Sequence, residues 1–219
     1  IFKKKLTDTL YAKMKNRSIY YSGEELDKLP TCFAIPKYIN QSEEIHSYYK
    51  KMLGDFIEKK NINGTMRDNI FIRLRQITSG FLQFDNEDGE KVLIEFDSNP
   101  KLDVLMTILR SIPADAKAVV FNEFTRSGDV ICQKLEEEGI KHARLYSGTK
   151  DKKGILDVFK QKDCRVFVIN SKSGNSNLNL QEASYVIYFE SPVSPIVRQQ
   201  SEARVYRTGQ TKRVYNYDL

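Results

Sequence analysis

The chain has 219 residues, of which 40% are hydrophobic and 29% are charged, and its formal net charge is +6 at pH 7. This length and composition suit one large domain, or one domain with a smaller appendage, built on a sizeable core. No apolar run approaches the roughly 20 residues that span a bilayer, so no membrane segment is predicted. The positive charge favours a polyanion as partner without requiring one.

Three cysteines and two histidines are too few and too widely spaced to predict a disulfide framework or a metal site. We therefore expect an intracellular, reducing setting, with each cysteine acting as a small buried side chain. The opening residues contain no recognisable signal peptide. Because the chain begins at Ile1 rather than Met and ends in strand-like residues, we expect it to be a piece of a longer protein.

The first hundred residues predict a mostly helical subdomain. Residues 42–60 and 69–84 carry apolar side chains at helical spacing. Pro30 and Pro36 bracket a short extended run that precedes these helices. The pattern changes at residue 100, so we expect a helical segment over 1–100 and a second domain over 101–219.

After Pro100, short apolar runs alternate with amphipathic segments. The runs predict strands at 118–121, 143–146, 165–170, 185–190 and 213–217, and the segments predict helices at 101–110, 128–138, 151–160 and 195–206. This alternation predicts an α/β fold, a parallel sheet with helices on both faces. Such sheets carry their functional residues in loops at the carboxyl ends of the strands.

The segment QSEARVYRTGQ, residues 200–210, carries two arginines and a glutamine at helical spacing. On a helix, Gln200, Arg204 and Arg207 would project from one face. Two guanidiniums beside an amide suit a triphosphate, because guanidinium forks match phosphate oxygens and can stabilise the charge that grows during phosphoryl transfer. The alternative is a pair of surface arginines that bind acids such as Glu190 or Glu202.

Three polar loops follow predicted strands. Residues 170–180, NSKSGNSNLNL, have small side chains whose amides and hydroxyls could hold phosphate oxygens, or they form an ordinary polar loop. Residues 147–150, SGTK, could bind phosphate at the start of a helix or simply cap that helix. In FNEFTRSG, residues 121–128, Thr125 or Ser127 could be a helix cap. No GxxxxGKS/T phosphate loop is present, so the chain alone is not expected to hold Mg-ATP.

Taken in this order, the segments resemble the C-terminal lobe of the Swi/Snf-type DNA translocases of helicase superfamily two. Residues 200–210 resemble motif VI of that family, residues 170–180 resemble motif V, and residues 119–126 resemble motif IV. The RLYSGT segment at 144–149 resembles the family segment that touches the tracked strand. The resemblance extends over nearly the whole chain, through inter-lobe helical segments at 29–30, 74–80 and 99–105.

The resemblance implies a RecA-like lobe of an ATP-hydrolysing DNA translocase or helicase. ATP and Mg²⁺ would be held mainly by the N-terminal ATPase lobe of the same protein, so this fragment alone would be inactive. Arg204 and Arg207 would reach the γ-phosphate as arginine fingers, with Gln200, Gly174 and Asn179 beside the nucleotide. Double-stranded DNA would be the other partner, and its backbone would be contacted by Thr125, Ser147, Gly148, Thr149, Ser171 and Lys172.

The sequence departs from the family pattern at several positions. Residues 175–177 replace glycines of motif V, Val193 and Ser194 stand where a Trp-Asn pair is usual, and Ala203 takes a position that is commonly acidic. Neither arginine is lost, so we expect an active motor of divergent, microbial or viral type. The alternatives are a catalytically silent module that binds nucleic acid or a partner, and a lobe of an RNA helicase.

Overall fold

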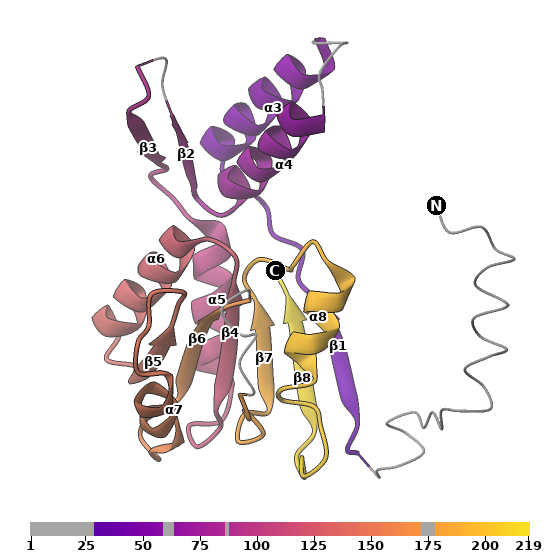
Figure 1. Cartoon of the computed structure of the whole chain (residues 1–219), viewed down its shortest axis with the longest axis vertical. Helices are drawn as coiled ribbons and strands as arrows, with labels where there is room; N and C mark the ends of the chain where they lie inside the picture. The colour runs from indigo at the N-terminus through magenta and orange to yellow at the C-terminus, as the bar shows by residue number, and fades with distance from the viewer. Residues whose placement is uncertain (1–28, 59–63, 86–87, 172–177) are drawn as a thin grey trace, which may run out of the picture.

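The computed structural model describes residues 29–58, 64–85, 88–171 and 178–219. These residues form a six-stranded sheet flanked by helices, with a smaller part, two helices and a hairpin, projecting beyond the carboxyl ends of the strands (Figure 1). The α/β fold predicted from the sequence is confirmed. No helix among these residues is long and apolar enough to cross a membrane.

The strands of the large sheet pair in parallel throughout, in the order β1-β8-β7-β4-β6-β5. The central strands are buried along almost their whole length, which explains their near-continuous apolar sequences. Each strand predicted after residue 100 begins at or next to the observed one. The strands span Cys32–Pro36 (β1), Ala118–Asn122 (β4), His142–Leu145 (β5), Val166–Asn170 (β6), Tyr185–Tyr188 (β7) and Val214–Asp218 (β8).

The edge strand β1 comes from the first hundred residues. It corresponds to the extended run predicted between Pro30 and Pro36, and it pairs with β8 from the other end of the chain, Cys32 opposite Val214. The sequence around β1 gives no sign of this distant partner. The division at residue 100 stays a prediction, although β1 belongs to the sheet of the second part.

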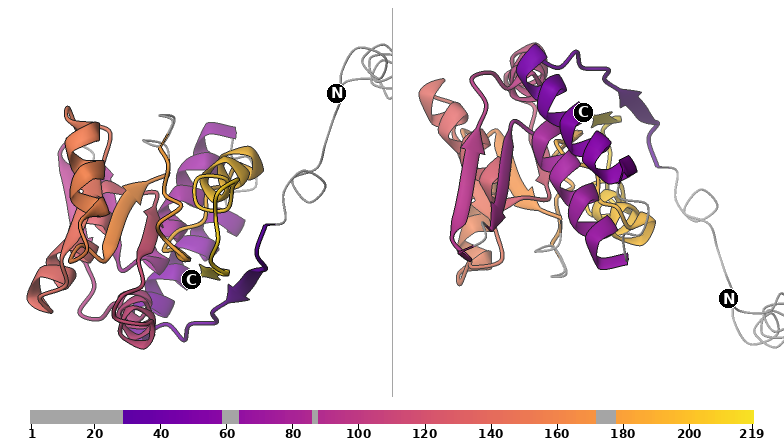
Figure 2. Two further views of the ribbon diagram at one scale, coloured as in Figure 1. Left: turned by 90° about the horizontal axis from the view of Figure 1, so that it is seen from below. Right: turned by 90° about the horizontal axis from the view of Figure 1, so that it is seen from above.

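Helices cover both faces of the sheet (Figure 2). On one face, α5 (Pro100–Ser111) and α6 (Thr125–Glu137) pack Leu105 and Ile131 against β4, β6 and β7. On the other face, α7 (Lys152–Lys160) buries Phe159, and α8 (Pro195–Glu202) lies over β7 and β8. Helix α6 begins three residues before its predicted start, at Thr125, so neither Thr125 nor Ser127 caps it.

The projecting part contains α3 (Glu43–Glu58), α4 (Gly64–Thr78) and an antiparallel hairpin of β2 (Phe81–Asp85) and β3 (Lys91–Glu95). The prediction of a single helix over 69–84 is wrong, because α4 ends at Thr78 and the chain turns at Gly80. Gly80 has φ +91°, a left-handed conformation that ends a helix, and its carbonyl accepts the Phe96 amide at 3.2 Å. A small core of Ile45, Ile77, Leu82 and Phe96 joins the helices to the hairpin.

Substitution of Gly80 by Ala tests this turn. A Cβ at Gly80 would overlap the side chain of Asn99, which caps α5 and donates to the Ser79 carbonyl at 3.0 Å. We expect Gly80→Ala to lower the free energy of unfolding by about 3 kcal/mol, from backbone strain and a disturbed cap.

Gly139→Ala is the matched control, because Gly139 also has positive φ, +65°, but no described atom lies within 4 Å of the place that its Cβ would take. Backbone strain alone should cost about 1 kcal/mol there. Urea unfolding of both variants measures the difference, and equal losses would contradict a role for Asn99.

Candidate functional site

The loops that follow β4 and β5 form a cavity at the carboxyl end of the sheet. In the sheet order β6 separates these two strands, so three neighbouring strands deliver their last residues to one place. The cavity has a volume of about 250 Å³ and includes two of the residues predicted to contact the DNA backbone, Thr125 and Ser147. Its lining comprises Asn122, Thr125, Arg144, Leu145, Tyr146, Ser147 and Asn170.

Side-chain amides and a buried carboxylate hold the loop after β4, which contributes to this cavity. The Asn170 amide donates to the Glu123 carbonyl at 2.8 Å, and the Asn122 amide donates to the Phe124 carbonyl at 2.7 Å. Glu190, 3% exposed, accepts the Glu123 amide at 2.8 Å and the Ser127 hydroxyl at 2.6 Å. Glu190, which follows β7, therefore holds the loop after β4 in place.

Arg144 is a cationic residue of this cavity that was not predicted from the sequence. It pairs with Asp129 at 2.6 Å, donates to the Thr125 carbonyl at 3.1 Å and lies 5.4 Å from the centre of the Tyr146 ring. These contacts orient its guanidinium beside Thr125 and partly offset its charge. The signal available in the sequence was its place in the segment RLYSGT, directly before the apolar Leu145, because successive residues of a strand face opposite sides of the sheet.

The other residues predicted to contact the DNA backbone differ in their exposure to solvent. Gly148 is exposed, and Thr149 closes a tight turn in which its hydroxyl accepts the Tyr146 amide at 3.0 Å. Helix α7 is capped by Asp151, so residues 147–150 form a loop rather than a helix cap. Ser171 is 1% exposed, and its hydroxyl has no hydrogen-bond partner among the described residues. Lys172 and Gly174 lie outside the described residues.

The predicted helix of motif VI is shorter than expected. Helix α8 begins after Ser194, whose hydroxyl accepts the Val197 amide at 3.5 Å, and it ends at Glu202 rather than Tyr206. Only Gln200 of the three singled-out side chains lies on the helix, where it is exposed. The prediction that the three project from one helical face is wrong, because the residues after Glu202 form turns.

We call residues 203–210 the finger turn. Within it, Arg204 is 9% exposed, and its Nη1 has no hydrogen-bond partner among the described residues. Burial lowers the pKa of its guanidinium. Arg207 is exposed, and neither arginine forms an ion pair within the described part of the chain. The alternative of surface pairing with Glu190 or Glu202 is wrong, since Glu190 binds Ser127 and Glu202 binds Arg198.

The finger turn is held against the segment that leads from motif V into β7. The Leu180 amide donates to the Arg204 carbonyl at 3.0 Å. Next to Leu180, the exposed Asn179 exchanges hydrogen bonds with Gln181, and the Gln181 side-chain amide donates to the Thr208 carbonyl. Asn179 is thus linked to the finger turn through Gln181, and its role in nucleotide binding stays a prediction.

Gln210 is the centre of this attachment, and no role was predicted for it from the sequence. Its side-chain nitrogen lies 3.0 Å from the carbonyls of Gln181 and Ala183 and 3.2 Å from that of Val205. Its side-chain oxygen accepts the Lys212 amide at 2.9 Å. Gln210 is 6% exposed, so these backbone groups would lose a buried partner without it. The signal available in the sequence was the place of Gln210 directly after Gly209, at the end of the arginine-containing segment 200–210.

The two groups of residues offer different chemistry. The cavity presents hydroxyls and amides, which can bind an anion without reading a base, and the finger turn presents two guanidiniums. Within the described ranges, no group of three or more His, Cys, Asp or Glu residues could hold a metal ion.

The family described as helicase conserved C-terminal domain matches residues 100–209, half of the chain. The chain belongs to this family. The Swi/Snf-type resemblance predicted from its motifs is confirmed by its relatives. Helicase SWR1 of Gibberella zeae is 32% identical over 144 residues, which cover 64% of this chain and 8% of that protein. A putative helicase of Invertebrate iridescent virus 6 is 25% identical in an alignment of 236 residues, gaps included, that covers 98% of this chain and 38% of that protein.

Solved structures of Swi/Snf-type helicase lobes share the fold. The C-terminal part of the Fun30 ATPase domain aligns with a TM-score of 0.72 at 20% identity, covering 88% of this chain and 86% of that chain. The Sulfolobus solfataricus SWI2/SNF2 ATPase core in complex with dsDNA aligns with a TM-score of 0.65 at 21% identity, covering 100% of this chain and 47% of that chain. The helicase lobe described here spans well under half of both curated relatives.

Gln210→Ala tests the attachment of the finger turn. The substitution removes the donor shared by three carbonyls, and we expect it to lower the free energy of unfolding by about 2–3 kcal/mol. Gln133→Ala is the matched control, because the Gln133 side chain bonds Glu137 on the exposed surface of α6, and it should cost less than about 0.5 kcal/mol. Similar unfolding midpoints for the two variants would show that Gln210 does not hold the turn.

Proposed function

We propose that this lobe is the C-terminal half of the motor of an ATP-dependent DNA translocase, and that it supplies arginine fingers to ATP held by an N-terminal lobe. The observation that carries the proposal is the finger turn. Among the described residues, the buried Arg204 has no partner for its Nη1, and the exposed Arg207 has no carboxylate partner. A buried guanidinium nitrogen without a hydrogen-bond partner lowers the stability of the fold, so Arg204 indicates an acceptor outside the described residues.

The residues of the finger turn fit a nucleotide triphosphate. Guanidinium forks match phosphate oxygens, and their positive charge stabilises the negative charge that increases at the γ-phosphate during hydrolysis. ATP with Mg²⁺ supplies the phosphoryl group that is transferred to water. Arg207 acts as the principal finger because it is accessible, whereas Arg204 is anchored through its carbonyl to Leu180. Gln200 and Asn179 flank the turn, and Gly174 belongs to the same proposed set.

The cavity at the carboxyl end of the sheet is the proposed contact with double-stranded DNA. Thr125 and Ser147 are exposed there, and Gly148 is exposed next to Ser147. Hydroxyls and amides bind phosphate oxygens without regard to sequence, as a motor moving over any sequence requires. Thr149, Ser171 and Lys172 belong to the same proposed set. A complex of a Sulfolobus solfataricus SWI2/SNF2 core with dsDNA shares this fold, which supports duplex DNA as partner.

Arg207→Ala in the full-length protein tests the finger. Loss of an arginine finger lowers turnover by about 10³-fold or more, because only the transition state loses its stabilising charge. Duplex DNA binding should stay within about twofold of wild type, since Arg207 lies outside the cavity. Arg213→Ala is the matched control, an exposed arginine in the same connection to β8, and it should retain turnover. Parallel loss of DNA binding and turnover would contradict the assignment.

Replacing Thr125 and Ser147 together by Ala tests the DNA contact. Loss of two hydrogen bonds to phosphate should weaken duplex binding about tenfold in the full-length protein. Fluorescence anisotropy at several salt concentrations measures this loss and should show affinity falling with salt for wild type and variant alike. Thr107→Ala, an exposed threonine on α5, should bind as wild type does. Unchanged affinity in the double variant would exclude the cavity as the contact.

A further inference from the structure

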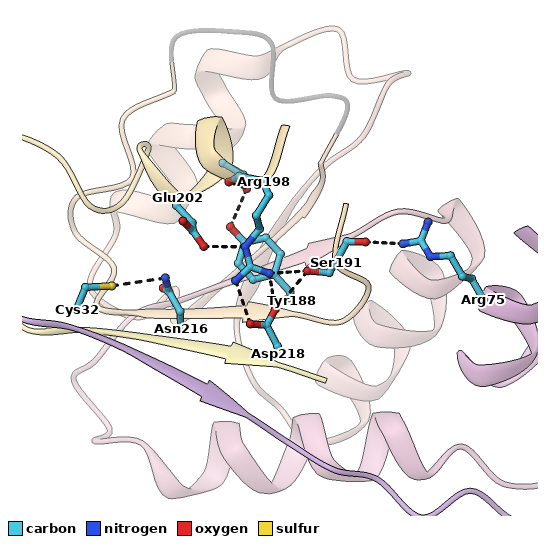
Figure 3. Close-up of polar contacts among 9 residues, drawn as sticks. Cys32, Arg75, Tyr188, Ser191, Arg198, Glu202, Asn216 and Asp218 are labelled. Carbon is cyan, nitrogen blue, oxygen red and sulfur yellow. Dashed lines mark hydrogen bonds and ion pairs between the residues drawn. The ribbon is translucent and has the colours of Figure 1, made fainter. Parts of the chain in front are cut away.

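Arg198 lies at the centre of a polar cluster between α8 and the sheet (Figure 3). Its guanidinium lies 3.4 Å from the centre of the Tyr188 ring on β7. Every nitrogen of the group donates. Nε bonds Glu202 at 2.7 Å, Nη2 bonds Asp218 at 3.1 Å, and Nη1 bonds both Asp218 and the Ser191 hydroxyl. Arg198 is not among the residues assigned to nucleotide or DNA above.

The cluster fixes the last turn of α8 on the sheet. Beside Arg198, the Ser201 hydroxyl lies 2.7 Å from the Tyr188 hydroxyl and donates to the Arg198 carbonyl at 2.7 Å. Burial disfavours the charge of Arg198, but its hydrogen bonds with Asp218 and Glu202 outweigh this effect and raise its pKa. A planar fork held between two carboxylates and over a ring has few alternative positions.

The cluster is continuous with the finger turn through Glu202. Glu202 is the last residue of α8, and its side chain is held by Arg198. Its carbonyl accepts the amides of Val205 at 3.0 Å and Tyr206 at 2.9 Å, which are among the hydrogen bonds at the start of the turn. Glu202, which Arg198 holds, is therefore one of the residues that fix the start of the finger turn, and the finger turn carries Arg204 and Arg207.

The cluster also reaches the projecting helical part. Arg75 of α4 donates to the Ser191 carbonyl at 2.6 Å, while the Ser191 hydroxyl accepts from Arg198 and lies 3.3 Å from Asp218 (Figure 3). One residue just after β7 thus joins α4 to α8. A displacement of α4 would be transmitted to Arg198 through this residue.

We propose that Arg198 is a positioning residue that sets the finger turn relative to the sheet and, through Ser191, to α4. This proposal rests on the function proposed above, in which the finger turn acts on ATP. Misplacement of a catalytic group by about 1 Å can lower a rate about 10²-fold, so loss of Arg198 impairs the fingers although it touches no substrate.

The test uses Arg198→Met and Arg198→Lys in the full-length protein, at a temperature well below the unfolding midpoint of each variant. We expect Arg198→Met to lower the kcat for DNA-stimulated ATP hydrolysis at least about tenfold, with the KM for ATP within about twofold. Affinity for ADP should be unchanged, whereas affinity for ADP with aluminium fluoride, a mimic of the transferring phosphoryl group, should fall about tenfold. Arg198→Lys should restore little of the loss, because one ammonium cannot satisfy both carboxylates.

Controls separate positioning from stability and from the proposed function. Arg110→Met breaks an exposed pair with Glu138 and should leave kcat unchanged. If Arg198→Met does not fold, Asp218→Asn removes the charged acceptor at similar shape and should show the same selective loss. A lowered unfolding midpoint, with kcat and the affinity for ADP with aluminium fluoride both unchanged, would overturn the positioning role. Absence of turnover in the wild-type protein would refute the proposed function and this inference together.

Discussion

The geometry of the finger turn depends on buried backbone groups that its neighbours must pair. Helix α8 ends at Glu202, and the chain then forms the finger turn. The Leu180 amide and the Gln210 side chain hydrogen-bond to carbonyls of this turn, and Gln210 also bonds the segment that enters β7. Unpaired buried carbonyls cost about 1–3 kcal/mol each, so this arrangement excludes a helix continued to Tyr206. The same bonds place Arg204 beneath the surface and leave Arg207 on it.

Local sequence predicts the sheet well because its strands are apolar runs buried on both faces. Residues 118–121 and 185–190 are recognisable without reference to any partner, and both contain strands. Features set by distant contacts could not be predicted. The helical spacing of residues 200–207 is overridden by Gln210, the aromatic residues after Gly80 form a hairpin, and β1 finds its partner at the end of the chain. For the same reason, the sequence motifs point to Arg207 but not to Arg144, Arg198 or Gln210.

The two sites proposed for phosphate groups lie at different ends of one sheet. The cavity occupies the carboxyl ends of β4, β5 and β6, whereas the finger turn and the segment at Leu180 lead into β8 and β7 from their amino ends. Ser171 follows β6 at the first end, and Leu180 contacts the finger turn at the second, so in the proposed function the chain connects the two sites covalently. The departures Val193 and Ala203 are exposed, so they leave the core of the lobe intact.

Steady-state ATP turnover by the full-length protein, with duplex DNA, single-stranded DNA, RNA or no nucleic acid, tests the central claim most directly. We predict that duplex DNA accelerates turnover more than RNA or single strands do, because the proposed function assigns the duplex backbone to the cavity and has the arginines complete the nucleotide site when the lobes close. Turnover stimulated by RNA alone would assign the lobe to an RNA helicase. No turnover under any of the four conditions would contradict a motor function and leave a binding module.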